Sequence, residues 1–344
     1  MPLRLPAEWE PQSAILLTWP HEQGDWEDID AAHAQFIALA TAIARFEPVL
    51  VSAHDEHWQR KITRTLETRQ CTFPVHVVVV ASNDVWARDH GPLTILDQGT
   101  PRLLDFQFNG WGNKFPAERD NALTRHLHGQ RVFGRVSLTT MDTVLEGGAL
   151  DSDGAGRLLV RRSAILTSTR NPGLDQVGFE RLVAECMGIE TVLWLEHGDL
   201  RGDDTDGHVD TLARFCSADA IAYQDCEDPG DPHHAPLKAM EKELEALRTR
   251  EGTPYRLVPL PLPRPLKDSS GRRLPAGYAN FLICNDAVLV PTYDDPTDAI
   301  ALERLGRAFP DRNVMGLDCR TLVHQNGSLH CTTMQLPEAI KLST

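Results

Sequence analysis

The sequence has no apolar run that approaches the roughly 20 residues needed to cross a bilayer. Its opening segment, MPLRLPAEWEP, has one Arg and no apolar stretch after it, so it also lacks the pattern of a secretory signal peptide. These absences predict a cytoplasmic protein that does not enter a membrane.

Positive charge is scarce relative to negative charge. Lys and Arg number 34 against 49 Asp and Glu, which gives a formal net charge of −15. This excess argues against binding to nucleic acid or to an anionic membrane surface, because both would be repelled. The same field would suit a small cationic substrate, although acidity by itself often serves only solubility.

Cysteine pairs at metal-binding or redox spacing are missing. The seven cysteines are an odd number, widely spaced, and none forms a CxxC pair. The sequence therefore gives no zinc motif and predicts that most of these residues are buried, reduced thiols.

Apolar runs of strand length alternate with amphipathic helical patterns along the chain, which is typical of an α/β protein. Helical spacing covers 36–46 and 237–247, and a third helix is expected to begin at Asp298. Pro-rich loops are expected over 225–236 and 259–265, but the same pattern resumes beyond them, so we predict a single domain over residues 1–344. The expected strands are Ala14–Thr18, Val75–Val80, Leu158–Val160, Thr191–Trp194, Leu282–Cys284, Val288–Pro291 and Val314–Leu317.

The first polar cluster covers 83–92 and directly follows the buried-looking strand Val75–Val80. Functional side chains often lie at strand ends, which makes Trp86 and Asp89 candidates for a site. The alternative is a capped turn with a surface ion pair between Arg88 and Asp89.

A second candidate is Glu146, which is followed by Gly147 and Gly148. Two glycines let the backbone turn tightly or approach another group closely. The alternative is an ordinary turn with an exposed Glu.

An acidic segment from Gly202 to Asp210 precedes a strand expected over 211–215. In a strand His208 and Asp210 would face the same side, which suits an acid/base imidazole beside a cation-binding carboxylate. An EF-hand calcium loop does not fit, because its first and twelfth ligand positions fall on Gly202 and Ala213. A solvated acidic loop remains the alternative.

Cys331 lies in the polar, Gly-containing segment 325–333 near the C-terminus. A lone cysteine is most often a packing residue. Metal binding by Cys331 and His330 together with His208 and Asp210 is another interpretation, although the spacing matches no known zinc pattern.

A thiol, an imidazole and several carboxylates together meet the needs of guanidinium hydrolysis. The guanidinium carbon is a poor electrophile for water, so the reaction needs a strong nucleophile. Carboxylates can grip the planar cation by paired hydrogen bonds, and an acid/base group can protonate the leaving ammonia and then activate water.

In this order, these segments resemble the agmatine deiminase and bacterial-type peptidylarginine deiminase family of the guanidino-modifying superfamily. The resemblance extends over nearly the whole chain. The matching segments are 6–11, 18–20, 86–92, 108–112, 146–148, 170–172, 207–210, 278–281, 295–298 and 327–331.

The resemblance implies a pentein fold, a five-bladed α/β propeller of ββαβ units with pseudo-fivefold symmetry and a central active site. It implies no metal and no organic cofactor, and it allows a homodimer. By resemblance Cys331 is the nucleophile, His208 the general acid/base, and Glu146 the partner that orients His208. The resemblance also implies that Asp89 and Asp210 are the guanidinium-binding carboxylates and that Trp86 and Asn280 are pocket residues.

The implied reaction is the deimination of agmatine to N-carbamoylputrescine and ammonia through a covalent thiouronium adduct. Agmatine is preferred because a dication suits the acidic chain. The segment 325–331 departs from the usual Gly-Gly-Gly-Asn-Ile-His-Cys, and the entry loop 19–22 also differs, so the tail of the substrate is left open. The alternatives are free, methylated or peptidyl arginine as substrate, amidino transfer to an amine, or non-catalytic binding of polyamines or arginine.

Overall fold

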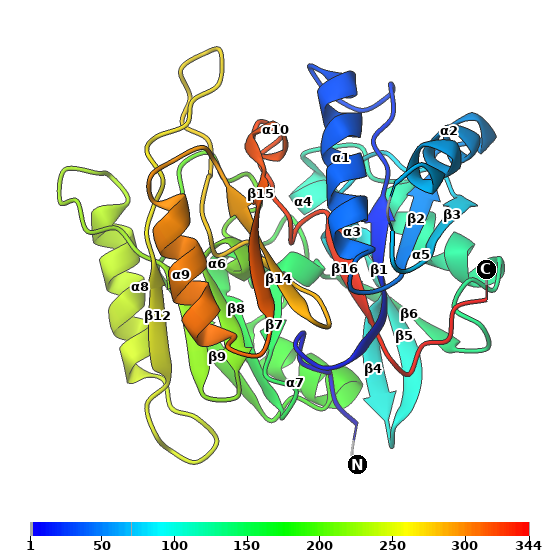
Figure 1. The fold of residues 1–344 in the computed structure, drawn as a ribbon. Coiled ribbons are helices and arrows are strands. Elements are labelled where there is room, and N and C mark those ends of the chain that lie inside the picture. Colours follow the sequence, from blue (N-terminus) through cyan, green and yellow to red (C-terminus); the bar gives the residue numbers. More distant parts are fainter. Residues whose placement is uncertain (1–2, 70, 344) are drawn as a thin grey trace.

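The computed structural model describes residues 3–69 and 71–343, and the strands in this part of the chain form five small sheets (Figure 1). In each sheet an antiparallel pair of strands is followed by a third strand parallel to the second. Parallel neighbours need a crossover connection, and a helix supplies it in every unit. This recurrence of one ββαβ unit confirms the predicted pentein fold.

The elements of the five units correspond in order along the chain. The first strands are β16 (Thr333–Pro337), β4 (Leu93–Asp97), β7 (Leu150–Ser152), β10 (Ala213–Ser217) and β13 (Leu282–Ile283). The second strands are β1 (Gln12–Thr18), β5 (Thr100–Gln107), β8 (Arg157–Arg161), β11 (Ala220–Gln224) and β14 (Ala287–Thr292). The third strands are β2 (Val49–Ala53), β6 (Ser137–Val144), β9 (Thr191–Leu195), β12 (Arg256–Leu260) and β15 (Asn313–Asp318). The crossover helices are α1 (Ile29–Ile43), α4 with α5 (Gly110–Asn113, Asp120–Gly129), α6 with α7 (Arg162–Ile165, Gln176–Met187), α8 (His234–Ala246) and α9 (Asp298–Ala308).

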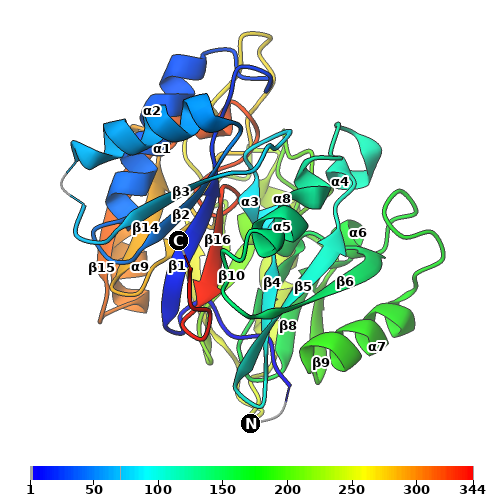
Figure 2. The same cartoon turned by 90° about the vertical axis from the view of Figure 1, so that its right-hand side faces the viewer.

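One unit is built from both ends of the chain. The C-terminal strand β16 pairs antiparallel with β1, with Leu16 opposite Met334 (Figure 2, red beside blue). This sheet also carries a fourth strand, β3 (Val75–Val79), which follows α2 (Glu56–Glu67) and pairs with β2. Because β3 lies at the outer edge, it is half-buried and not the buried strand that its apolar sequence predicted.

The predicted helices are confirmed with small changes at their ends. Asp28 caps α1 by accepting a hydrogen bond from the Ala31 amide, and α1 buries Phe36, Leu39 and Ile43. The helix α9 begins at Asp298 as expected. The helix α8 begins at His234, so the last residues of the expected loop 225–236 already form its first turn.

The expected strand over 211–215 begins later than predicted, and His208 with Asp210 do not lie in it. They belong to a turn that contains the 3-10 helix η2 (Val209–Thr211). The His208 amide donates to Thr205 Oγ1 and the Thr211 hydroxyl donates to the His208 carbonyl, both at 3.0 Å. Such local side-chain bonds compete with strand pairing. These hydrogen bonds hold the turn in a shape that directs His208 and Asp210 toward the centre of the molecule.

Among the residues that the structure describes, none of the helices combines the length and apolar character needed to span a bilayer.

Candidate active site

The segments that enter the first strands of the five units carry the predicted site residues. Asp89 lies in the short helix α3 (Ala87–His90) before β4, and Glu146 precedes the 3-10 helix η1 (Gly147–Ala149) before β7. His208 and Asp210 precede β10, Asn280 precedes β13, and Cys331 precedes β16. Pseudo-fivefold symmetry places equivalent segments around one axis. Residues far apart in the sequence therefore meet there.

His208 is held by Glu146 on one side and faces Asp89 on the other. Its Nε2 lies 3.1 Å from Glu146 Oε2, and its Nδ1 lies 3.6 Å from Asp89 Oδ1. Burial alone would lower the pKa of His208, but the neighbouring carboxylates outweigh burial and raise that pKa to about 9. The imidazole is therefore a cation at neutral pH.

Glu146 is buried and paired with Arg170. The Nε of Arg170 donates to both carboxylate oxygens of Glu146, at 2.8 and 2.7 Å. Arg170 also donates to Asp206 Oδ2 at 2.7 Å and to the Thr205 carbonyl at 2.9 Å. It thereby ties the Glu146 segment to the turn that carries His208.

Asp89 has two donors that fix both of its oxygens. The Gly148 amide donates to Oδ1 at 2.9 Å, and Trp111 Nε1 donates to Oδ2 at 3.0 Å. Trp111 has φ 56°, the left-handed region that a bulky residue seldom adopts.

Gly148 is required by the space around it. A Cβ at this position would lie 2.6 Å from His208 Nδ1 and 2.7 Å from Asp89 Oδ1. The prediction that a glycine here allows a close approach is confirmed.

Cys331 faces Asp210. The Sγ of Cys331 donates to Asp210 Oδ2 at 3.5 Å. Burial, followed by the negative charges of Asp210 and Asp89, raises the pKa of Cys331 well above its ordinary value. Without a ligand, Cys331 is therefore a thiol.

Asn280 acts on the backbone behind the thiol. Its Oδ1 accepts from the amides of His330 and Cys331, at 3.0 and 3.3 Å, and its Nδ2 donates to the Asp210 carbonyl at 3.3 Å. Asn280 thus fixes the two segments that carry Cys331 and Asp210 and does not line the pocket described next.

A pocket of about 490 Å³ opens above Cys331 and Asp89. Its aromatic wall consists of Trp86, Trp111 and Phe115. Trp86 Nε1 donates to Asp84 Oδ2 at 3.0 Å, and a Cβ on Gly327 would lie 2.0 Å from the Trp86 ring. The other lining residues include three carboxylates, Asp25, Asp84 and Asp204.

These carboxylates, Trp111 and Arg170 were not assigned a role from the sequence alone. Trp111 lies in segment 108–112, which matches the family, so the sequence pointed to this segment but not to the role of Trp111. Arg170 lies in the matching segment 170–172, and it pairs with Glu146 inside the protein. Within residues 3–69 and 71–343, no group of three or more His, Cys, Asp and Glu side chains is arranged to hold a metal ion.

The family of Porphyromonas-type peptidyl-arginine deiminases matches residues 4–337. The chain belongs to this family. Agmatine deiminase of Pseudomonas aeruginosa (strain LESB58) is 34% identical over 97% of this chain and 95% of its own length. Several other relatives of this chain are also named agmatine deiminase.

Two solved structures of the family share the fold over almost their full length. A Porphyromonas gingivalis protein named as a candidate arginine deiminase is 47% identical, with a TM-score of 0.92 over 98% of this chain and 100% of its own. A Cys-to-Ser variant of C. jejuni agmatine deiminase with substrate bound is 34% identical, with a TM-score of 0.90 over 99% and 97%. Family membership therefore rests on sequence and fold together.

Proposed function

We propose that this chain hydrolyses the guanidinium group of agmatine to N-carbamoylputrescine and ammonia, with Cys331 as the nucleophile. The observation that carries this proposal is the contact of Cys331 Sγ with Asp210 Oδ2 at 3.5 Å, in a buried site that also holds Asp89 and His208. Relatives named agmatine deiminases support the choice of reaction.

The first half of the reaction forms the covalent adduct. Asp89 and Asp210 bind the guanidinium cation, whose positive charge favours release of the thiol proton of Cys331 to solvent. The thiolate forms a bond to the guanidinium carbon, and His208 gives a proton to the departing nitrogen as the C–N bond breaks. Ammonia leaves, and a thiouronium adduct remains on Cys331.

The second half uses the neutral imidazole that this step produced. His208 takes a proton from water, and the resulting hydroxide attacks the adduct carbon. The C–S bond breaks with its electron pair left on sulfur, and the proton of the added hydroxyl passes to that thiolate. The ureido product leaves, Cys331 is again a thiol, and His208 is again an imidazolium.

The pocket favours a substrate with a positively charged tail. Asp25, Asp84 and Asp204 line it, and the nearby cation Lys114 is engaged by Asp206 at 2.8 Å. An ammonium tail complements this charge, whereas the carboxylate of free or C-terminal arginine would be repelled. This supports agmatine over arginine.

The test is a panel of agmatine, free arginine, methylated arginine and a peptide with C-terminal arginine, assayed for ureido product. Agmatine should give the highest kcat/KM, and a higher value for the peptide would overturn the choice. Ammonia release without an added amine separates hydrolysis from amidino transfer.

We also infer that the chain acts as a single cytoplasmic domain that needs no metal. All seven cysteines are free thiols, which supports a reducing compartment. Full activity after dialysis against EDTA is expected, and metal-dependent activity would contradict the inference.

A further inference from the structure

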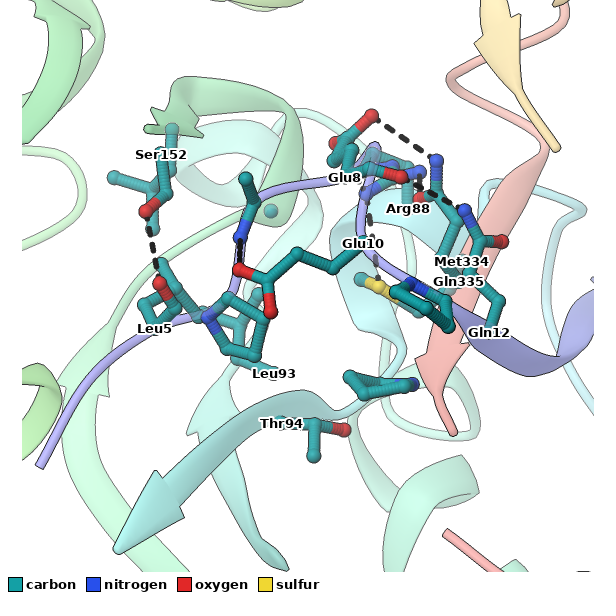
Figure 3. A pocket seen from close by; sticks show the side chains of 16 residues that line it. Leu5, Glu8, Glu10, Gln12, Arg88, Leu93, Thr94, Ser152, Met334 and Gln335 are labelled. Carbon is teal, nitrogen blue, oxygen red and sulfur yellow. Dashed lines mark hydrogen bonds and ion pairs between the residues drawn. The ribbon is translucent and has the colours of Figure 1, made fainter. Parts of the chain in front are cut away.

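A second pocket lies behind the catalytic segments. It has a volume of about 580 Å³ and is crossed by the N-terminal segment that carries Glu8 and Glu10 (Figure 3). In Figure 3 Glu8 faces Arg88 and Gln335, while Glu10 turns away from them.

Glu8 accepts hydrogen bonds from four buried side chains. Arg88 Nη1 donates at 3.0 Å, His330 Nε2 at 2.8 Å and Gln335 Nε2 at 3.0 Å. Arg214 Nη2 also donates to it. These donors come from α3, β10, β16 and the segment before β16, so Glu8 joins three units of the ring.

His330 connects Glu8 to the substrate-binding carboxylate. Its Nε2 lies 2.8 Å from Glu8 Oε1, and its Nδ1 lies 2.8 Å from Asp210 Oδ2. Both nitrogens can donate at the same time only when the ring is an imidazolium. A fully buried cation therefore lies between two carboxylates.

The other oxygen of Asp210 remains open. Asp210 Oδ1 is buried and finds no hydrogen-bond partner among the residues that the structure describes. An unpaired buried carboxylate oxygen is costly, and a guanidinium N–H would satisfy it.

We propose that Glu8 and His330 are positioning residues for the deimination reaction: Glu8 holds the His330 imidazolium, which fixes Asp210 beside Cys331 as an ionised carboxylate with one oxygen free for the guanidinium. The inference rests on the function proposed above. Neither residue touches the substrate, and both act through Asp210.

The charges around Asp210 support the proposal that His330 keeps Asp210 ionised. Burial would raise the pKa of Asp210, but its hydrogen bond to His330 and the positive charges of His330, His208 and Arg214 hold that pKa below its ordinary value. The titratable and charged groups that face this cluster are His208, Arg214, His330, Cys331, Asp89, Arg88, Glu8 and Asp151. His330 is the cation in direct hydrogen-bond contact with the Asp210 carboxylate.

The test measures agmatine binding by calorimetry from pH 3 to pH 8.5, in a Cys331→Ala background that prevents turnover. Guanidinium binding needs ionised Asp210, so the contribution of Asp210 is present above its pKa and lost as the pH falls through it. Burial raises the pKa of Asp89, so the loss through Asp89 comes at higher pH and is common to all variants, and the difference between variants reports Asp210. His330→Gln and Glu8→Gln should each move the midpoint of this loss upward by at least about one pH unit. Should one variant not fold, the other decides the question.

Glu10→Gln is the matched control. Glu10 lies on the same segment and lines the same pocket, but it bonds Arg4 and the Ala7 amide and not His330. Its pH midpoint should equal that of the parent. Unchanged midpoints in His330→Gln and Glu8→Gln, or affinity lost equally at every pH, would overturn the proposal.

A second ligand separates this inference from the proposed function. Butylguanidinium has the guanidinium group but no distal ammonium, and it needs only the carboxylates around Cys331. If the unmodified chain failed to hydrolyse agmatine, the proposed function would fall. The pH midpoint for butylguanidinium would still decide whether Glu8 and His330 act on Asp210.

Discussion

The Nε2 atom of His208 lies 3.1 Å from Oε2 of Glu146, and both side chains are 1% exposed. A buried carboxylate at this distance stabilises the imidazolium form, which is the form that the proposed reaction needs to protonate the departing nitrogen. The same contact orients the ring, so that Nδ1 faces Asp89 Oδ1.

The first prediction concerns the fall of kcat at alkaline pH, the alkaline limb of the pH–rate profile. Because the pKa of His208 is about 9, kcat should fall as the pH rises through that value. Glu146→Gln removes one carboxylate that raises this pKa, so the limb should move to lower pH, and kcat at pH 8 should fall by about tenfold or more. A pH–rate profile of both proteins measures the shift. Glu196→Gln, an exposed position paired with Arg162, serves as the control, and an unmoved limb in Glu146→Gln would contradict the assignment.

The second prediction concerns the nucleophile. Cys331→Ala should lower kcat by at least about a thousandfold, because no other group can form the covalent adduct. Rapid quenching of the unmodified protein with agmatine should show the adduct mass on the peptide that contains Cys331. Cys186→Ala, a half-buried thiol in α7 outside the pocket, should retain activity. Near-normal turnover in Cys331→Ala would contradict a covalent mechanism through Cys331.

A third prediction uses the crowding around Gly148. In Gly148→Ala the new methyl group would lie 2.6 Å from His208 Nδ1 and 3.1 Å from Asp210 Oδ2. The groups must move apart, and misplacement by about 1 Å can lower kcat/KM by about a hundredfold. Gly306→Ala is the control, since that helical glycine has nothing within 4 Å of the new Cβ. Equal kcat/KM values for the two variants would show that the close packing is not needed.

Much of the architecture follows from local sequence patterns, but several contacts of the site do not. Apolar runs of strand length predicted strands such as β14, and helical spacing of apolar residues predicted helices such as α1 and α8, because burial in the core determines both patterns. The turn at His208 was misplaced because its geometry depends on hydrogen bonds to Thr205 and Thr211, which hydrophobic patterning does not contain.

Contacts between residues far apart in the sequence also could not be predicted from local patterns. Trp111 reaches Asp89 through a left-handed backbone conformation that a bulky residue adopts only when the surrounding structure imposes it. Glu8 and His330 are separated by more than three hundred residues and meet only because β16 closes the ring against β1. The family resemblance predicted which side chains converge, whereas the contacts that hold them required the fold.

The fourth prediction concerns the tail of the substrate. Asp204 lines the pocket, and burial, followed by the charge of Asp203, raises its pKa to about 6. The ammonium of agmatine favours the ionised carboxylate, so KM should rise as the pH falls through about 6. Asp204→Asn should raise KM for agmatine by about tenfold at pH 8, which is the size of one hydrogen bond to a charged group. Butylguanidinium should be processed equally by both proteins, and an equal loss for both substrates would place Asp204 outside tail recognition.

The last prediction concerns the ionisation of the resting thiol. Cys331 is buried between Asp210 and Asp89, whose negative charges oppose a thiolate, so its pKa lies well above the ordinary value. Alkylation of Cys331 by iodoacetamide without ligand should therefore rise with pH and show no midpoint below about 9. Mass spectrometry of the Cys331 peptide isolates this site from the other cysteines.

Asp210→Asn sharpens the measurement, because it removes the nearest negative charge while keeping the shape of the side chain. The thiolate then forms more easily, and the alkylation midpoint should move to lower pH. The competing arrangement is a resting ion pair in which the His208 imidazolium stabilises a thiolate before substrate arrives. That arrangement would give a midpoint below about 7 in the unmodified protein, and such a result would reject activation of Cys331 by the substrate cation.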